Sequence, residues 1–189
     1  RSFTILNMWE EVDKNISIWI QKNLYMEEVA NVFYRWTDFL NSPLFKFLFL
    51  VVFLYSIFPK LKSSLKRIPL IFIGGFVFDR GVHFLKEGIA RQRPNFIELG
   101  LDLGHRCLEV GGYAFPSGHS SVSFFIVGLL GTFSWKRQLL WWVLAFLVVI
   151  PRVYCGIHFL GDVLAGGVLG YLAGYLLGKF VFSAGENHE

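Results

Sequence analysis

Apolar residues gather in five stretches that are separated by short segments rich in charged residues. Each stretch approaches the roughly 20 apolar residues that a transmembrane helix needs. We expect membrane-spanning helices at Pro43–Phe58, Ile68–Leu85, Ser120–Trp135, Leu139–Val153 and Phe159–Phe182. The sequence therefore predicts an all-α integral membrane protein, in which a bundle of about five transmembrane helices occupies residues 43–182.

The first 42 residues follow a different, amphipathic pattern. Large apolar residues recur there at helical spacing, with acids and lysines between them: Trp9, Val12, Ile16, Trp19, Ile20 and Leu24. This pattern is typical of a helix that lies in the membrane interface with its tryptophans towards lipid. A helix packed on the edge of the bundle would give the same pattern. We expect one membrane-embedded domain over residues 1–189, with residues 1–42 as its interfacial segment.

The composition agrees with a membrane protein. Hydrophobic residues make up 54% of the chain and Phe alone occurs 21 times, which is far from the average of soluble domains. The formal net charge of +4 does not indicate a nucleic-acid partner, because the cations lie between apolar stretches rather than in one solvated run. The start of the chain lacks the pattern of a removable signal peptide, so none is expected.

Basic residues in the short loops predict the orientation of the bundle. The loop 59–69 carries Lys60, Lys62, Lys66 and Arg67 without an acid, and Lys136 and Arg137 follow the third span. Short loops rich in lysine and arginine usually face the cytoplasm. Three blocks of polar residues between the other span ends are then expected on the outer side.

The block nearest the C-terminus combines Arg152, His158 and Asp162. His158 and Asp162 are four residues apart, so they are expected to share a face at the start of the last helix. A carboxylate beside an imidazole fixes its tautomer and leaves the other nitrogen free to attack. Arg152 converges with His158 only if the chain breaks the helix over 154–156. A structural polar contact is the alternative interpretation of the His–Asp pair.

The middle block is Pro116–Ser117–Gly118–His119, directly before an apolar helix. Ser117 could cap that helix, and the amides at its N-terminus, including that of Gly118, could bind an anion. A plain helix cap is the alternative. With two histidines in separate blocks, one could attack while His119 protonates the leaving oxygen.

The first block supplies Lys86, Arg93 and Pro94. The planar fork of an arginine and the point charge of a lysine both suit phosphate oxygens. We expect Arg91 to be solvated or to contact headgroups. Asp79 and His83 recur with Lys86 at helical spacing, so that face of the helix is expected to look inward as a salt-bridge network.

Taken together, the blocks resemble the type 2 phosphatidic acid phosphatase superfamily, whose signature is K-x6-RP, then PSGH, then SR-x5-H-x3-D. The matching residues are Lys86, Arg93, Pro94, Pro116, Ser117, Gly118, His119, Arg152, His158 and Asp162. Pro151 stands where the family usually has the serine before the arginine, which removes a hydroxyl and a backbone donor.

The resemblance implies a metal-independent phosphatase without a cofactor. His158 would attack phosphorus with help from Asp162, and His119 would protonate the leaving oxygen and later activate water. The phosphate oxygens would be bound by a further set: Lys86, Arg93, Ser117, Gly118 and Arg152. No cluster of carboxylates or Cys/His spacing in the sequence fits a metal site.

The small size and bare bundle are similar to bacterial inner-membrane members of the family, with the active site facing the periplasm. We expect a membrane phospholipid or lipid A as substrate, with the 1-phosphate of lipid A preferred. Phosphatidylglycerol phosphate and undecaprenyl pyrophosphate are the alternatives. More distant alternatives are a non-enzymatic lipid-binding or transport protein and a vanadate-dependent peroxidase. The sequence does not indicate an oligomeric state.

The two cysteines fall in the outer loops that flank these blocks. On the expected orientation, Cys107 and Cys155 both lie on the oxidising side of the membrane. A disulfide between them would brace the two loops. Two free thiols are the alternative interpretation.

Overall fold

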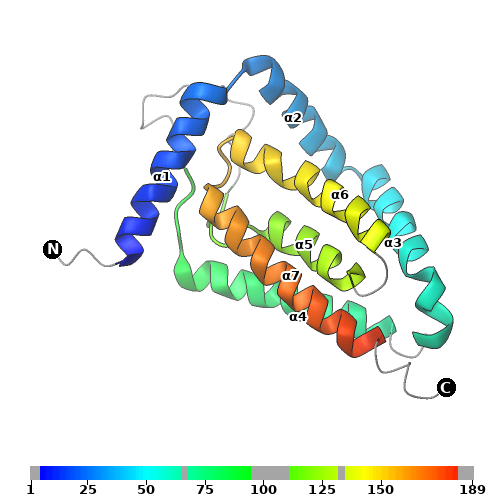
Figure 1. The fold of residues 1–189 in the computed structure, drawn as a ribbon. Coiled ribbons are helices and arrows are strands. Elements are labelled where there is room, and N and C mark those ends of the chain that lie inside the picture. Colours follow the sequence, from blue (N-terminus) through cyan, green and yellow to red (C-terminus); the bar gives the residue numbers. More distant parts are fainter. Residues whose placement is uncertain (1–4, 65–67, 95–110, 132–134, 183–189) are drawn as a thin grey trace.

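The computed structural model describes residues 5–64, 68–94, 111–131 and 135–182, and these ranges contain helices and no strand. The helices are α1 (Ile5–Leu24), α2 (Glu27–Asn41), α3 (Pro43–Ser64), α4 (Ile68–Ile89), α5 (Gly118–Leu130), α6 (Trp135–Tyr154) and α7 (Leu160–Phe182). Figure 1 shows α4 to α7 as a bundle, with α1 crossing one end of it and α2 and α3 along one side. The chain is therefore an all-α bundle, as the sequence predicts.

The centre of the bundle is the close pair of α5 and α7. A Cβ atom built on Gly170 would collide with the backbone carbonyl oxygen of Ser121, and one on Gly174 would collide with that of Phe125. Gly128 makes the reciprocal approach to the carbonyl oxygen of Tyr171. Small residues allow such backbone contact between helices in lipid. The two helices therefore meet backbone to backbone along most of α5.

Apolar side chains complete the core around α5. Val127, Leu129 and Leu130 are fully buried, and Trp141 of α6 is 2% exposed. The indole nitrogen of Trp141 donates a hydrogen bond to Ser56 Oγ of α3 at 3.1 Å. A buried indole N–H needs such a partner, so this bond ties α3 to the core.

Helices occupy all five stretches in which spans were predicted, although four of their ends differ from the prediction by four to six residues. The expected third span ends at Trp135, whereas α5 ends at Leu130 and Trp135 begins α6. Among the described residues, α7 alone is long and apolar enough to cross a membrane on length and composition. The segments Glu27–Leu40 and Pro43–Ser56 pass the same test together as one span bent by 69°.

The outer surface of the bundle is apolar. Large hydrophobic side chains such as Phe47 of α3, Phe76 of α4, Val143 of α6 and Phe180 of α7 are exposed. Contiguous exposed apolar surface of this kind suits contact with a membrane.

Helix α1 packs on the bundle through its polar face. Asp13, Ser17 and Gln21 are buried, whereas Trp9 and Trp19 are exposed. The Gln21 amide donates hydrogen bonds to the carbonyl oxygens of residues 153 and 154 at the end of α6, at 3.0 and 2.9 Å. Helix α1 thus packs on the edge of the bundle, which was one of the two interpretations of its pattern. Its tryptophans still face outward, as the interpretation as an interfacial helix requires.

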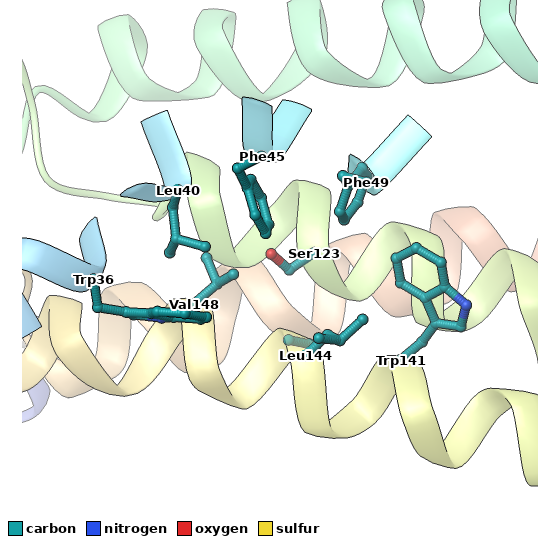
Figure 2. Close-up of a pocket in the computed structure, with 9 residues that line it drawn as sticks. Trp36, Leu40, Phe45, Phe49, Ser123, Trp141, Leu144 and Val148 are labelled. Atoms are coloured by element: carbon teal, nitrogen blue, oxygen red, sulfur yellow. The ribbon is translucent and has the colours of Figure 1, made fainter. Parts of the chain in front are cut away.

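The junction of α2 and α3 packs on α5 and α6 through aromatic side chains. Figure 2 shows Trp36, Phe45 and Phe49 facing Trp141 and Ser123 across a cavity of about 20 Å³. The indole nitrogen of Trp36 donates to the carbonyl oxygen of Leu147 at 2.9 Å. This hydrogen bond holds α2, which follows α1 in the chain, against α6.

Candidate active site

All three sequence blocks meet at one end of the bundle. Helix α4 ends there, α5 and α7 begin there, and α1 crosses beside them (Figure 1). The residues brought together come from segments up to 76 positions apart in the chain, from Lys86 to Asp162. The fold therefore assembles the predicted site residues in one place.

The turn between α6 and α7 brings Arg152 next to His158. Helix α6 ends at Tyr154, and Gly156 has a left-handed φ of 65° that favours glycine. The amides of Ile157 and His158 donate to the Arg152 carbonyl oxygen at 3.0 and 3.1 Å. The predicted break in the helix is present. His158 lies in the turn before α7, however, and not on the helix as the sequence suggested.

His158 and Asp162 are in contact inside the site. His158 Nδ1 lies 3.5 Å from Asp162 Oδ2, and Oδ2 also accepts the Phe159 amide at 2.9 Å. His158 is 3% exposed and Asp162 is fully buried. Burial lowers the pKa of His158, and the neighbouring Arg93 adds to this, so the imidazole is kept neutral although Asp162 acts in the opposite sense.

The tautomer of His158 follows from its second neighbour. Arg93 Nη1 lies 3.2 Å from His158 Nε2. A guanidinium can only donate, so Nε2 accepts and the ring hydrogen belongs on Nδ1, towards Asp162. The Nε2 lone pair thus accepts from Arg93, so Nε2 can attack phosphorus only after Arg93 Nη1 moves from this nitrogen to a phosphate oxygen.

Carbonyl groups hold Lys86 and Arg93 in place. Lys86 Nζ donates to the Tyr113 carbonyl oxygen at 2.9 Å. Arg93 donates from Nε to the Gly112 carbonyl at 3.0 Å and from Nη1 to the Ile157 carbonyl at 3.0 Å. These bonds join the end of α4, the segment before α5 and the turn before α7. Among the described residues, neither cation has a carboxylate ion-pair partner that would cancel its charge.

Arg152 and Ser117 are buried, and some of their hydrogen-bond donors have no partner among the described residues. The atoms concerned are Arg152 Nε and Nη2 and Ser117 Oγ. Buried donors without partners are costly, so their presence points to an anionic ligand. Ser117 opens α5 but its side chain does not cap it, and its amide donates to the Asp162 carbonyl at 2.9 Å. The plain-cap interpretation of Ser117 is therefore wrong.

The middle block places the second histidine at the rim. Gly118 is the first residue of α5 and His119 is the second, and the His119 side chain is exposed. His158 by contrast is buried, in the turn before α7. The two imidazoles thus occupy different depths of the same end of the bundle.

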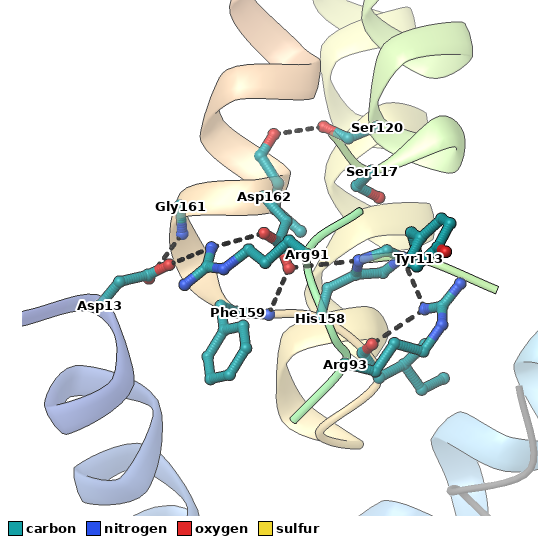
Figure 3. Close-up of polar contacts among 12 residues, drawn as sticks. Asp13, Arg91, Arg93, Tyr113, Ser117, Ser120, His158, Phe159, Gly161 and Asp162 are labelled. Carbon is teal, nitrogen blue, oxygen red and sulfur yellow. Dashed lines mark hydrogen bonds and ion pairs between the residues drawn. The ribbon is translucent and has the colours of Figure 1, made fainter. Parts of the chain in front are cut away.

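Two residues of the site were not identified from the sequence. Arg91 Nη1 forms ion pairs with Asp162 Oδ1 at 2.6 Å and with Asp13 Oδ2 of α1 at 2.8 Å (Figure 3). The expected solvated role of Arg91 is therefore wrong. The sequence could have pointed to Asp13, because Asp13, Ser17 and Gln21 recur at i, i+4 and i+8 and so share one polar face of α1. That face is buried.

The expected inward polar face of α4 is wrong for two of its three members. His83 is exposed, and Asp79 pairs with the adjacent Arg80 at 2.6 Å while remaining partly exposed. Val82 is buried in their place. Only a narrow face of α4 contacts the bundle. Residues adjacent in sequence to a buried one, such as His83 beside Val82, therefore lie outside the core.

Two further expectations reach beyond the described residues. Cys155 is buried, but Cys107 lies outside the described ranges, so the disulfide stays a prediction. Within those ranges, no group of three or more His, Cys, Asp or Glu side chains is arranged to hold a metal ion.

Comparisons with known proteins agree with this architecture. The PAP2 superfamily model matches residues 68–186. Phosphatidylglycerophosphatase B of Bacillus subtilis is 36% identical over 107 residues, covering 51% of this chain and 49% of that protein. A lipid A 4'-phosphatase of Bacteroides thetaiotaomicron is 35% identical over 101 residues, covering 49% and 44%. The chain thus matches about half the length of these relatives.

A solved structure extends the similarity to almost the whole chain. The crystal structure of a transmembrane PAP2-type phosphatidylglycerolphosphate phosphatase from Bacillus subtilis superposes with a TM-score of 0.68. It is 26% identical and covers 92% of this chain and 86% of that one. On its residues, its helical membrane fold and the family model, the chain belongs to the PAP2 superfamily.

Proposed function

We propose that the protein is a membrane lipid phosphatase that hydrolyses a phosphomonoester or pyrophosphate through a phosphohistidine. The observation that carries the proposal is the set of buried donors on Arg152 and Ser117 beside His158 and Asp162. A phosphoryl group offers the acceptor oxygens that these donors lack. Arg93 lies next to His158 Nε2. It would therefore contact the phosphoryl group when that group approaches this nitrogen.

In the first step, His158 Nε2 attacks phosphorus in line and forms the N–P bond as the bond to the leaving oxygen breaks. Asp162 supports the Nδ1–H and the positive charge that grows on the ring. His119 gives its proton to the leaving oxygen. The exposed position of His119 suits a group that meets the lipid side of the scissile bond.

Water completes the cycle in the second step. His119, now neutral, takes a proton from water as the oxygen attacks phosphorus, and the N–P bond breaks to release phosphate and free His158. The equatorial oxygens are held throughout by a set of donors: Lys86, Arg93, Arg152, Ser117 and the Gly118 amide. Charge gathers on these oxygens in the transition state, so fixed cations there lower the barrier.

A groove beside the site supports a lipid substrate. Apolar side chains of α3, α4 and α5 line a groove of about 530 Å³, with Lys46 and Asp79 as charged members of its lining. The lining residue Val122 lies three positions after His119. Asp79 lies seven positions before Lys86, about 10 Å along α4. A lipid could therefore place its chains in the groove and its phosphate in the site.

For the substrate we propose a phosphate of lipid A, with the 1-phosphate as the sequence-based preference. Relatives named lipid A 4'-phosphatase support a lipid A substrate, although not that position. Phosphatidylglycerol phosphate is the second candidate, because both the relative and the solved structure with that activity in their names resemble this chain. We place the protein in a bacterial inner membrane with the site facing the periplasm, on the basis of the basic loops at the other end.

The test is phosphate release by purified protein from lipid A, phosphatidylglycerol phosphate and undecaprenyl pyrophosphate, each with EDTA present. We expect release from at least one lipid. His158→Ala should lower the rate by roughly four orders of magnitude. His119→Ala should retain more activity on a nitrophenyl phosphate, whose leaving group needs little protonation, than on a lipid phosphate.

A labelled substrate identifies the nucleophile. Acid-labile label should be trapped on His158, and label on His119 would reverse the two assignments. Release from none of the three lipids, with intact lipid binding, would support the non-enzymatic alternative. Loss of activity in EDTA that a divalent ion restores would contradict the mechanism.

A further inference from the structure

We propose that Asp13 of α1 and Arg91 are positioning residues that keep the negative charge of Asp162 available to His158. This inference rests on the proposed function, because it assigns a role within the same site. It makes α1 part of the catalytic apparatus in addition to an interfacial helix.

The three side chains form one buried chain of charges. Arg91 Nη1 bridges Asp162 Oδ1 at 2.6 Å and Asp13 Oδ2 at 2.8 Å (Figure 3). The side chains of Arg91 and Asp13 are 14% and 11% exposed, and that of Asp162 is fully buried. Two carboxylates share one guanidinium, so the cluster keeps one net negative charge.

That remaining charge explains why the site needs Asp13. A single Arg91–Asp162 pair would cancel the charge that stabilises the cationic ring of His158 as it bonds to phosphorus. Asp13 draws part of the Arg91 charge to itself and leaves Asp162 the stronger anion. Burial by itself would lower the pKa of Arg91, but Asp162 and Asp13 together raise it, so the guanidinium stays charged.

The first turn of α7 is shaped to receive Asp13. The Gly161 amide donates to Asp13 Oδ1 at 2.7 Å. A Cβ atom on Gly161 would lie 2.6 Å from Asp13 Oδ2, so a side chain there would displace the Asp13 carboxylate. Arg91 also stacks on the ring of Phe159, with its guanidinium carbon 4.3 Å from the ring centroid. Two residues just before Asp162 therefore hold the α1 carboxylate and its arginine.

The experiment measures kcat and KM of the full chain in mixed micelles, on whichever of the three lipids named above the wild type hydrolyses. We expect Asp13→Asn to lower kcat about tenfold, with KM changed by less than about twofold, because the change weakens charge support in the transition state. Asp13→Glu keeps the charge and should retain more activity than Asp13→Asn. Glu10→Gln, an exposed acid of the same helix, is the matched control and should match the wild type.

Two further variants test the connection through Arg91. In an Arg91→Gln background, Asp13→Asn should cost less than about twofold more, because there is no longer a guanidinium charge for Asp13 to offset. Gly161→Ala adds a methyl group that displaces Asp13 and should reproduce the loss in kcat. Gly81→Ala of α4, where no described atom lies within 4 Å of an added Cβ, is its control. If Asp13→Asn does not yield folded protein, Gly161→Ala and Asp13→Glu carry the test.

Several results would overturn the inference. Wild-type kcat in both Asp13→Asn and Gly161→Ala would do so, as would an equal loss in Glu10→Gln or full additivity of the Asp13 and Arg91 changes. If His158→Ala is inactive while Asp13→Asn is normal, this inference fails and the proposed function stands. If the wild type releases phosphate from no lipid, the proposed function fails and the inference with it.

Discussion

Helix α7 has two neighbours that hold it in opposite ways. Along its length it meets α5 backbone to backbone through glycines, with apolar side chains around the contact. At its first turn it meets α1 through a carboxylate, an amide and a shared arginine. The first contact determines whether the bundle forms, whereas the second acts on the orientation and charge of Asp162. Helix α5 thus holds α7 mainly by packing and α1 holds it by charge, while the start of α5 also supplies Gly118 and His119 to the site.

The largest effect is expected from breaking the α5–α7 contact. Gly170→Val would force a side chain onto the Ser121 carbonyl oxygen, where backbone cannot move without separating the helices. Such overpacking costs about 1–3 kcal/mol or more. We expect loss of monodisperse protein after detergent extraction, measured by size-exclusion chromatography. Gly81→Ala should elute as the wild type does, and a normal profile for Gly170→Val would contradict the close contact.

Near the other contact, acid should lower activity by protonating His158, and the same protonation should lower the stability of the fold. Attack requires neutral His158, and burial lowers the pKa of His158 below the usual value of about 6.5. The acid limb of the kcat/KM profile, which reports the free enzyme, should therefore lie below that pH. His158 binds a proton more tightly in the unfolded chain than in the folded protein. The stability of the fold therefore also decreases as the pH drops through the ordinary histidine range. An acid limb above pH 7 would contradict a buried, neutral nucleophile.

A smaller effect is expected from loosening α1 itself. Gln21→Leu removes two hydrogen bonds to the carbonyl groups at the end of α6, where the Val153 carbonyl still accepts the Gly156 amide. The cost should be about 1–3 kcal/mol, seen as a lower unfolding midpoint in detergent. Asn15→Ala, on the exposed side of α1, should leave the midpoint unchanged. An unchanged midpoint in Gln21→Leu would mean that α1 is held by its charged contacts alone.

The smallest effect is expected on the outward face of α1. Trp19 is 58% exposed, so Trp19→Gln should change the stability of the bundle in detergent by less than about 0.5 kcal/mol. The same unfolding measurement tests this. A large loss would show that Trp19 packs against protein, and the contrast between the two faces of α1 would disappear.

Sequence patterns predicted the helices and the three blocks because both signals are local. Apolar stretches, helix periodicity and fixed spacings such as His158 to Asp162 need no knowledge of the fold. The Asp13–Arg91 contact joins residues 78 positions apart, so only the tertiary arrangement reveals it. The predictions of where α5 ends and of an inward-facing His83 were wrong for the same reason. Both features depend on which neighbour each helix face meets.

The break between α2 and α3 has a consequence for where the chain can bend within a bilayer. The Ser42 hydroxyl accepts the Phe45 amide at 3.1 Å, and the Ser42 amide donates to the Phe39 carbonyl at 3.0 Å. A bend of 69° in hydrocarbon would otherwise leave peptide groups without water or partner. A single serine supplies bonds on both sides of the corner, so the bend keeps two of its own peptide groups paired without help from solvent.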